Sequence, residues 1–398
     1  MQPTVSTTER ILFYSHDSYG LGHLRRTLTL AGALIERRPN ASVLVVSGSP
    51  CATHFPLPRG VEIVKLPSVT KNEHGEYTPR SLPGGLDQLQ RLRRALLRVA
   101  FDSFEPELLV TDHQPIGLCG ELLGVLRRAK ATGTRTILGL RDVIDDPDTV
   151  ASQWSHPDVR EALGDLYDRV CVYGVPEVFD QRIEYPIPPE LCSRVEFTGY
   201  VVRPGDQAQV RSGLAGRPRV LVTAGGGEDG EGHVVTYLEC LRLAAAPWDS
   251  TIVLGPLMHP LQVRHVKRMA KTLRNVRVHT FHAEMPRLLA ESDAVVSMAG
   301  YNTVAKILQA RVNAVLLPRV FPRREQLIRS QRLERLGLVS MIADPKPRPL
   351  RVAVEHALAS RRDWSRVPAL EGRSRVCDIV GQLLDQVAAS AGSVREAR

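Results

Sequence analysis

A short stretch near the start of the chain, SYGLGHLRRT at 18–27, combines two glycines, a histidine and two arginines directly after an apolar run. Gly20 and Gly22 begin a dinucleotide-binding fingerprint, but Arg25 stands where its third glycine belongs, and no acidic ribose ligand ends the next apolar run. The stretch is either a tight strand–helix turn or a loop that places His23 at a helix start. There a neutral imidazole could act as a general base, because its pKa lies near working pH.

Two further loops of the first half carry charged and imidazole side chains at the ends of apolar runs. Asp112 and His113 lie in TDHQPIG, and Arg141 and Asp142 lie in GLRDVIDDPD. Ligands of parallel sheets bind beyond the carboxyl ends of the strands, so these four side chains are candidates for lining a binding site. Buried ion pairs and helix caps use the same residue types, so a purely structural role stays open for each of them.

The segment TAGGGEDGEGH at 223–233 has five glycines in eleven residues. Gly225, Gly226 and Gly227 would let backbone N–H groups approach an anion closely at the start of a helix. No Lys-Ser or Lys-Thr pair follows, so the segment is not a Walker loop. Phosphate binding is the favoured interpretation, and a simple glycine-rich turn is the alternative.

A second candidate for anion binding is SMAGYNTVAKILQA at 297–310, where an apolar run ends in Ala299 and Gly300. Asn302 or Thr303 is expected to cap the helix that follows. The first turn of that helix would offer N–H groups and the positive end of its dipole to a pyrophosphate. A capped helix without a ligand would have the same sequence.

The segment PRVFPRREQLIRSQRLERLG at 318–337 brings Glu325 and Gln326 together after an apolar run. An adjacent carboxylate and amide can accept and donate hydrogen bonds, which suits a ligand with several hydroxyl groups. A solvated charged helix is the structural alternative.

These loops are predicted to lie between strands and helices that alternate along the chain. Most of the candidate strands are apolar on successive residues, as in parallel sheets covered on both faces. The expected strands are 11–15, 41–48, 61–67, 107–112, 135–142, 169–174, 194–200, 219–227, 250–255, 276–281, 293–300, 313–319 and 337–342. A polar stretch rich in Gly, Pro and Arg interrupts the series at 203–218 and is expected to be a linker. The prediction is an α/β chain of two tandem Rossmann-like, doubly wound domains facing a cleft.

Composition limits the partners and the compartment. The net charge of +9 favours anionic partners, but aromatic residues make up only 5% and are not interleaved with basic ones, so nucleic acid is not expected. The six cysteines are scattered without C-x-x-C spacing, which suits reduced thiols in the cytoplasm. No apolar run is long enough to span a bilayer. A cytoplasmic protein is therefore expected, with peripheral contact to the cytoplasmic face of a membrane left open.

Taken together, these segments resemble the GT-B superfamily of nucleotide-sugar glycosyltransferases, specifically the MurG-like group, glycosyltransferase family 28 and its relatives. The matches are GLGHLRRTLTLA, TAGGG and AGYNTVAKIL…LLPR…REQLIRSQRLERLG, in this order over nearly the whole chain. The resemblance implies a metal-independent enzyme with no cofactor besides its nucleotide-sugar co-substrate, most simply of UDP type. It implies an acceptor domain at 1–202, a donor domain at 219–373, and a segment at 374–398 whose helix, at about 374–389, crosses back to the acceptor domain.

The resemblance also implies roles for individual residues. His23 would be the catalytic base. The acceptor side would comprise Gly20, Gly22, Asp112, His113, Arg141 and Asp142. The donor side would comprise Gly225, Gly226, Gly227, Phe281, His282, Ala299, Gly300, Asn302, Thr303, Lys306, Glu325 and Gln326. Within that set, Phe281 and His282 would border the nucleobase, 299–303 the diphosphate, and Glu325 and Gln326 the sugar hydroxyls.

One position departs from the family pattern. The helix after Gly300 usually bears a glutamate that holds the ribose hydroxyls, and Lys306 stands at that position. Lysine has no hydrogen-bond acceptor, so it suits a phosphate better than a ribose. Either the donor is unusual, or donor use is weakened or lost, or a neighbouring acid such as Glu284 holds the ribose.

Alternatives to a transferase also stay open at this stage. A non-hydrolysing UDP-sugar 2-epimerase shares the architecture, and Lys306 is compatible with a catalytically silent nucleotide-sugar-binding partner. The acceptor itself is not identified by the sequence: a phosphorylated, a lipid-linked and a small soluble acceptor are all compatible with the charge.

Overall fold

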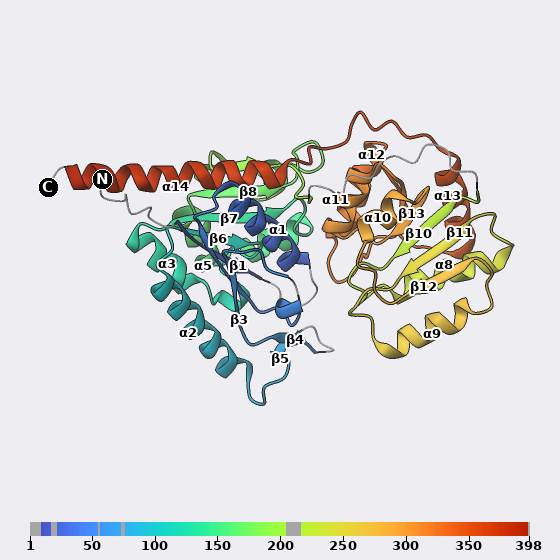
Figure 1. Cartoon of the computed structure of the whole chain (residues 1–398), viewed down its shortest axis with the longest axis horizontal. Coiled ribbons are helices and arrows are strands. Elements are labelled where there is room, and N and C mark those ends of the chain that lie inside the picture. Colours follow the sequence, from blue (N-terminus) through green and yellow to red (C-terminus); the bar gives the residue numbers. More distant parts are fainter. Residues whose placement is uncertain (1–8, 17–21, 55, 73–75, 204–215, 397–398) are drawn as a thin grey trace. The chain divides into compact units, whose positions relative to one another are not determined.

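The computed structural model describes residues 9–16, 22–54, 56–72, 76–203 and 216–396 (Figure 1). The chain divides into two compact units. The first comprises Met1–Val175, Asp180–Val201 and Glu371–Arg398, and the second comprises Pro176–Phe179 and Val202–Leu370. Most of the expected linker, residues 204–215, lies outside the described residues.

The first unit contains a seven-stranded parallel sheet with the order β3-β2-β1-β6-β7-β8-β9. Its strands are β1 (Arg10–Ser15), β2 (Ser42–Ser47), β3 (Val61–Lys65), β6 (Leu108–Asp112), β7 (Arg135–Arg141), β8 (Arg169–Tyr173) and β9 (Val195–Phe197). Every residue of β6 is buried, as the unbroken apolar run predicts for a strand covered on both faces. Because the strands are parallel, their carboxyl ends lie along one edge of the sheet.

Helices and short helical turns connect these strands. The helices are α1 (Gly22–Arg37), α2 (Leu86–Phe104), α3 (Leu123–Thr132), α4 (Pro147–Trp154), α5 (Pro157–Glu161), α6 (Gln181–Glu184), α7 (Pro189–Cys192) and α14 (Gly372–Glu396). The turns are η1 (Ala52–His54), η2 (Leu118–Gly120) and the π-helical η3 (Ala162–Leu166). The long α14 packs against α1 within the first unit, where Arg37 of α1 donates to Asp378 of α14 over 2.5 Å (Figure 1).

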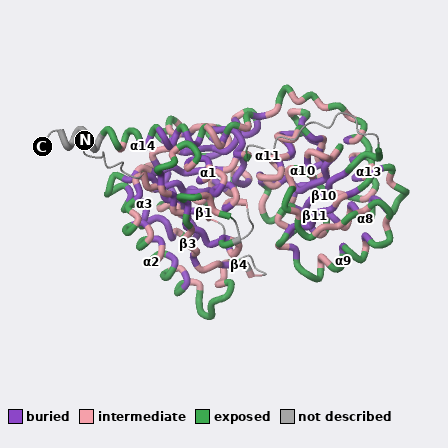
Figure 2. The backbone as a smooth tube through the Cα atoms, viewed as in Figure 1, coloured by how far each residue is buried: buried purple, intermediate pink, exposed green. Residues whose placement is uncertain are grey.

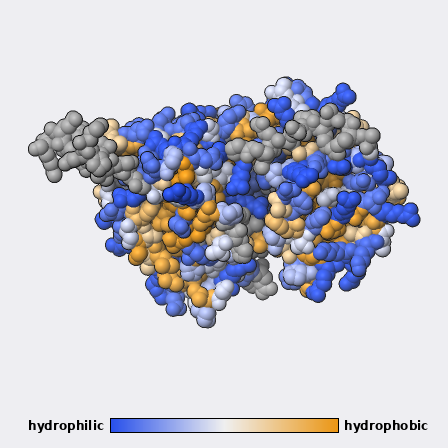
Figure 3. Space-filling view, viewed as in Figure 1, coloured by the Kyte–Doolittle hydropathy of each residue, from blue (hydrophilic) through white to orange (hydrophobic). Residues whose placement is uncertain are grey.

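A two-stranded antiparallel hairpin of β4 (Val69–Lys71) and β5 (Tyr77–Pro79) is an addition that the strand pattern does not predict. It precedes α2, whose exposed face carries Leu92 and Val99. Figure 3 shows apolar surface on the side of the first unit where α2 and α3 lie.

The second unit contains a six-stranded parallel sheet with the order β12-β11-β10-β13-β14-β15. Its strands are β10 (Arg219–Thr223), β11 (Asp249–Val253), β12 (Val276–His279), β13 (Ala294–Ser297), β14 (Asn313–Leu316) and β15 (Ser340–Met341). Its helices are α8 (Glu231–Leu243), α9 (Pro260–Ala270), α10 (Met285–Ala290), α11 (Tyr301–Ala310), α12 (Glu325–Arg335) and α13 (Pro347–Ala359).

The buried residues of each unit follow the strands and the inner faces of the helices (Figure 2). In the second unit, one apolar cluster joins Val222 of β10, Trp248, and Val354 of α13, all almost fully buried. The predicted α/β class with two doubly wound parallel sheets is confirmed. The expected strands 219–227 and 293–300 end earlier, at Thr223 and Ser297, because the chain turns into loops after these residues.

Candidate active site

His23 lies in the first turn of α1, beyond the carboxyl end of β1, and contacts the last residue of β6. Its Nδ1 is 2.6 Å from Oδ2 of Asp112. Arg26, one turn further along α1, donates to Oδ1 of the same carboxylate from Nε at 3.1 Å and from Nη2 at 2.6 Å. A helix start and a strand end, 89 residues apart in sequence, thus meet at one carboxylate.

The charges around His23 determine its protonation. Arg26 and His23 hold the pKa of Asp112 down at about 2, although burial acts to raise it. Burial, with smaller contributions from Arg26 and Arg141, lowers the pKa of His23 to about 4 against the opposing effect of Asp112. An ionised Asp112 can only accept a hydrogen bond, so the proton of the neutral imidazole is on Nδ1 and the lone pair is on Nε2. His23 is therefore a neutral, oriented base at neutral pH.

Two more imidazoles lie beside His23. The ring of His113, directly after β6, is 4.9 Å from that of His23, and the ring of His16, directly after β1, is 6.0 Å from it. Arg141, the last residue of β7, places Nη2 3.2 Å from Nε2 of His113. His113 and Arg141 were predicted for this edge. His16 was missed, although its place directly after a strand was a signal that could have identified it.

The other residues predicted for this half differ in their placement. Asp142 is fully buried, and its carboxylate accepts from the backbone N–H of Val143 and from the Tyr200 hydroxyl, each over 2.8 Å. These contacts hold the chain after β7 rather than exposing a carboxylate to a ligand. Gly22 begins α1, and Gly20 lies outside the described residues.

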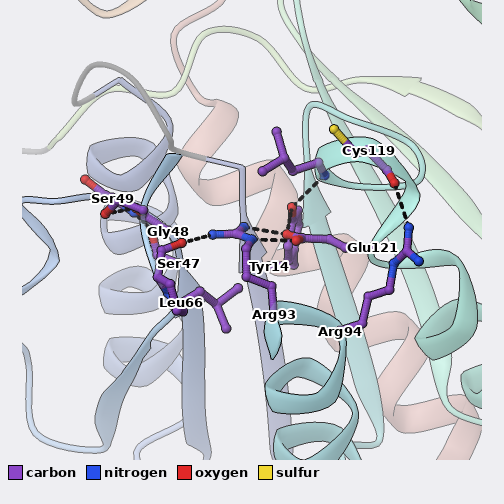
Figure 4. A network of polar contacts seen from close by, with 12 residues as sticks. Tyr14, Ser47, Gly48, Ser49, Leu66, Arg93, Arg94, Cys119 and Glu121 are labelled. Carbon is purple, nitrogen blue, oxygen red and sulfur yellow. Dashed lines mark hydrogen bonds and ion pairs between the residues drawn. The ribbon is translucent and has the colours of Figure 1, made fainter. Parts of the chain in front are cut away.

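A buried ion pair between Arg93 and Glu121 lies beside Tyr14 of β1 (Figure 4). Arg93 of α2 donates to both oxygens of Glu121, at 2.6 and 2.5 Å, and Tyr14 of β1 donates to Glu121 Oε1 over 2.7 Å. The Tyr14 hydroxyl also accepts from the backbone N–H of Leu118 over 2.9 Å. Burial and the Glu121 charge raise the pKa of Tyr14, so it stays a neutral donor. The network fixes the loop after His113 against β1.

In the second unit, the glycine loop (224–230) packs against another loop through its glycines. A Cβ on Gly227, which has a φ of +99°, would lie 2.6 Å from the carbonyl oxygen of Leu254. Gly226 accepts from the backbone N–H of Leu257 over 2.9 Å. Gly225 faces a different element, because a Cβ built on it would lie 4.0 Å from Oγ1 of Thr303 in α11. One glycine of the predicted anion loop thus serves close packing, and another borders the start of α11.

The start of α11 has open space in front of it. A Cβ built on Gly300, the residue that precedes the helix, would meet no described atom within 4 Å. Gly300 has an extended conformation, and no side chain caps the helix, so the expectation that Asn302 or Thr303 caps it is wrong. Both follow Gly300 inside the helix, where their side chains cannot adopt the extended N-cap position. Ala299, directly before Gly300, is fully buried.

Arginines connect these loops to α12. Arg319 donates to Asp229 of the glycine loop over 2.8 Å and to Glu325 of α12 over 2.7 Å. Arg329, fully buried and one turn beyond Glu325, donates to the carbonyl oxygen of Ala299 over 2.8 Å. The predicted residues Gly225, Ala299, Gly300, Thr303, Glu325 and Gln326 are thus brought together by three loops around the start of α11. We call this arrangement the α11 ring.

The remaining predicted residues lie apart from these contacts or on their edge. Phe281 is exposed, and the ring of His282 stacks edge-on with His279 at 5.5 Å. Among the described residues, no hydrogen bond, ion pair or ring contact joins either side chain to the α11 ring. Lys306 lies in α11, one turn beyond Asn302, and is partly buried. Glu284, the neighbouring acid considered for ribose binding, forms an exposed ion pair with Arg287 at 3.4 Å.

The described residues contain neither a candidate metal site nor a candidate membrane span. No three His, Cys, Asp or Glu side chains there are grouped so that they could hold a metal ion. None of the helices found there has the length and apolar content that a membrane span requires.

Known proteins share this fold and part of this sequence. Residues 239–359, from α8 to the end of α13, match the family described as the glycosyltransferase family 28 C-terminal domain. No curated protein sequence matches the chain. Among solved structures, the glycosyltransferase of kitacinnamycin is 18% identical with a TM-score of 0.62, and 95% of this chain covers 99% of that one.

Two other solved structures are similar over comparable lengths. MurG of Acinetobacter baumannii is 13% identical with a TM-score of 0.60, covering 94% of this chain and 99% of that one. A UGT transferase from Siraitia grosvenorii, solved in complex with UDP, is 13% identical with a TM-score of 0.55, covering 94% of each chain. The predicted GT-B and MurG-like resemblance is confirmed. The chain therefore has the GT-B fold, and its residues 239–359 match the glycosyltransferase family 28 C-terminal domain.

Proposed function

We propose that this enzyme transfers a sugar from a nucleoside-diphosphate donor, of UDP type, to a hydroxyl or amine acceptor without using a metal ion. The observation that carries the proposal is the contact between His23 and Asp112 at the carboxyl edge of the first sheet. A neutral imidazole whose Nδ1–H is held by a buried carboxylate keeps Nε2 available as a proton acceptor.

In the proposed reaction, the acceptor oxygen or nitrogen attacks the anomeric carbon of the donor sugar while Nε2 of His23 takes its proton. The bond between the anomeric carbon and the diphosphate oxygen breaks, and the nucleoside diphosphate departs with the bonding electrons. The imidazolium that forms is stabilised by Asp112, which stays ionised throughout because its pKa is about 2.

The α11 ring supports the donor part of the proposal. The start of a ten-residue helix, with open space in front of Gly300, offers backbone N–H groups and a positive dipole end to a diphosphate. Lys306 lies on the same helix and can add a positive charge near the departing group. These positive charges are the basis for proposing that the diphosphate is stabilised without a metal. The UGT transferase from Siraitia grosvenorii was solved in complex with UDP, which favours UDP as the first donor nucleotide to test.

The net charge and the cysteines support general proposals about the acceptor and the compartment. The net charge of +9 supports an acceptor with an anionic group, whether phosphorylated, lipid-linked or a small soluble metabolite. The scattered cysteines, all free thiols where described, support a cytoplasmic site of action, with or without peripheral membrane contact.

Thermal unfolding in the presence of UDP, GDP, TDP, ADP and a phosphoribosyl donor tests the proposed donor class. A ligand at a hundred times its dissociation constant adds about 2.7 kcal/mol to the free energy of unfolding. We expect at least one nucleoside diphosphate, UDP first, to raise the melting temperature. No shift with any of the five compounds would overturn the donor assignment.

A further inference from the structure

Arg319 lies in the α11 ring, where it ends the LLPR segment of the family resemblance, but the sequence assigned no role to it. It follows β14, and its guanidinium reaches Asp229 of the glycine loop on one side and Glu325 of α12 on the other, over 2.8 and 2.7 Å. The two carboxylates raise the pKa of Arg319, so the guanidinium stays charged. One side chain therefore holds two of the three loops of the ring together.

The backbone of Arg319 also fixes the orientation of a neighbouring amide. Its N–H donates to Oε1 of Gln326 over 3.1 Å. Because an N–H group requires an acceptor, the oxygen of the Gln326 amide must face Arg319, and Nε2 must point away from it. None of the described residues accepts a hydrogen bond from Nε2 of Gln326. The amide is thus held so that it presents donors.

The carboxylate of Glu325 is in a different situation. Its side chain is only 4% exposed, and Oε1 accepts from Arg319. Arg319 itself is 27% exposed. At this point of the ring the more accessible group is therefore the guanidinium, while the carboxylate lies beneath it and holds it in place.

We infer that Arg319 is a positioning residue for the donor sugar: its side chain anchors its own segment to Asp229 and Glu325, so that its backbone N–H keeps the amide nitrogen of Gln326 directed toward the sugar. The inference rests on the proposed function, because it assumes a nucleotide-sugar donor in the α11 ring. The site then reads an oxygen of the sugar that accepts a hydrogen bond from Gln326. An adjacent Glu and Gln pair that bound hydroxyls with both side chains would instead need the Glu325 carboxylate exposed.

Arginine is required for this arrangement rather than any positive charge. Its planar guanidinium carries donors in several directions, so it can bridge two carboxylates that lie on opposite sides. The ammonium group of lysine, on a flexible stem, cannot keep both contacts in the same geometry. An Arg319→Lys variant therefore separates charge from positioning.

Binding titrations with UDP, UDP-glucose, UDP-galactose and UDP-N-acetylglucosamine test the inference. The measured quantity is the affinity for the best of the three nucleotide sugars relative to the affinity for UDP alone. Arg319→Ala keeps the backbone N–H but frees its segment from Asp229 and Glu325, so that the Gln326 amide is no longer held in place. We expect this variant to lower the ratio at least about tenfold, while UDP affinity changes less than about twofold. Arg319→Lys should give an intermediate ratio, and guanidinium ion added to Arg319→Ala should partly restore it.

Two further variants keep the test independent of folding. Arg351 of α13 is similarly shielded, pairs with Glu355 and bonds the carbonyl oxygen of Ala244, but it lies outside the ring. Arg351→Ala is the matched control: it should lower the melting temperature without changing the ratio. Gln326→Glu keeps the contact with the Arg319 N–H and replaces the amide donor with a carboxylate oxygen, so it should lower the ratio as Arg319→Ala does.

The outcomes separate the two proposals. A wild-type chain that binds no UDP and no UDP-sugar contradicts the UDP donor and the inference together. A wild-type chain that binds UDP and a UDP-sugar, with the ratio unchanged in Arg319→Ala, overturns the inference alone. If none of the three sugars changes the wild-type affinity relative to UDP, the inference is also overturned, because no sugar contact exists for Arg319 to position.

Discussion

Nη2 of Arg26 lies 3.1 Å from Nδ1 of His23, and both groups contact the carboxylate of Asp112. Since Nδ1 carries the proton that Asp112 accepts, the guanidinium and the imidazole are two donors that share one acceptor. Burial is the main cause of the lowered pKa of His23, and the Arg26 charge lowers it as well because a second positive charge beside the guanidinium is unfavourable. Arg26 was left without a role in the sequence interpretation, and the structure gives it an electrostatic one.

The acid limb of the pH–rate profile should report this arrangement. His23 acts as a base only while neutral, so the rate should fall as the pH drops through its pKa of about 4. The readout is slow hydrolysis of the nucleotide sugar, which needs no acceptor. Arg26→Gln removes a positive charge that lowers the pKa of His23, so the limb should move to higher pH. If the wild-type rate instead fell near pH 6.5, the ordinary pKa of histidine, this would contradict the assignment of His23 as a buried, neutral base.

Asp112→Asn should reduce the rate more than it reduces donor binding. The amide cannot stabilise the imidazolium, and it leaves Arg26 buried without its carboxylate, so we expect a loss of about 100- to 10,000-fold in kcat. The control is Asp168→Asn, which removes a carboxylate that pairs with Arg135 over 3.1 Å at the opposite end of β7. Wild-type turnover in Asp112→Asn, or an equal loss of kcat in Asp168→Asn, would contradict the role assigned to the His23–Asp112 pair.

Glu121→Gln should destabilise the first unit. It breaks the buried pair with Arg93 and leaves a charge in a dry environment, which costs about 3–5 kcal/mol in comparable cases. The matched control is Glu161→Gln, which breaks an exposed pair with Arg127 and should leave urea unfolding unchanged within error. Equal effects of the two variants on the urea midpoint would show that the network in Figure 4 adds no more than a surface pair.

Two glycines of the second unit should respond differently to alanine. Gly227 has a φ of +99° and no room for a Cβ, so Gly227→Ala should lower stability by roughly 1–3 kcal/mol. Gly300 has a φ of −64° and open space, so Gly300→Ala should fold normally while its methyl group obstructs the diphosphate. Melting temperature and UDP affinity are the two measurements. Unchanged UDP affinity in Gly300→Ala would place the diphosphate elsewhere.

Lys306→Glu tests the departure from the family pattern. If the lysine neutralises the diphosphate, reversing its charge should weaken UDP binding roughly tenfold at low salt, and less at high salt because the interaction is screened. Lys267→Glu, on the exposed part of α9, is the control of equal charge change. Tighter UDP binding in Lys306→Glu would mean that the lysine simply replaces a ribose-binding glutamate.

The sheets were predictable from the sequence, whereas several side-chain roles were not. The unbroken apolar runs predict β6 and β10 because a strand covered on both faces needs no polar alternation. The same reasoning places Asp112 at a strand end but cannot determine its partner, since the contact with His23 joins residues 89 positions apart. Asp142 has the same local pattern and is buried instead, because the hydroxyl that binds it comes from Tyr200.

The glycine-rich motif shows the same limit. Its composition permits either anion binding or close packing, and the choice depends on which backbone lies opposite. Gly227 faces the backbone of Leu254, whereas Gly225 faces Thr303. Arg319 ends the matched LLPR segment but received no role, because a single arginine after a strand does not show which groups it contacts, and the two carboxylates that it bridges are far from it in sequence or on another element.

The packing of α14 on α1 has a consequence for the order of events during synthesis. The helix that bears His23 is synthesised before the second unit, whereas α14, which packs against it, follows that unit. The second unit is almost continuous, from Val202 to Leu370, and can fold as it emerges. The first unit therefore lacks the helix that packs against α1 until the second unit has been synthesised. A nascent chain stopped before residue 371 would lack α14 and leave this surface of α1 exposed to chaperones.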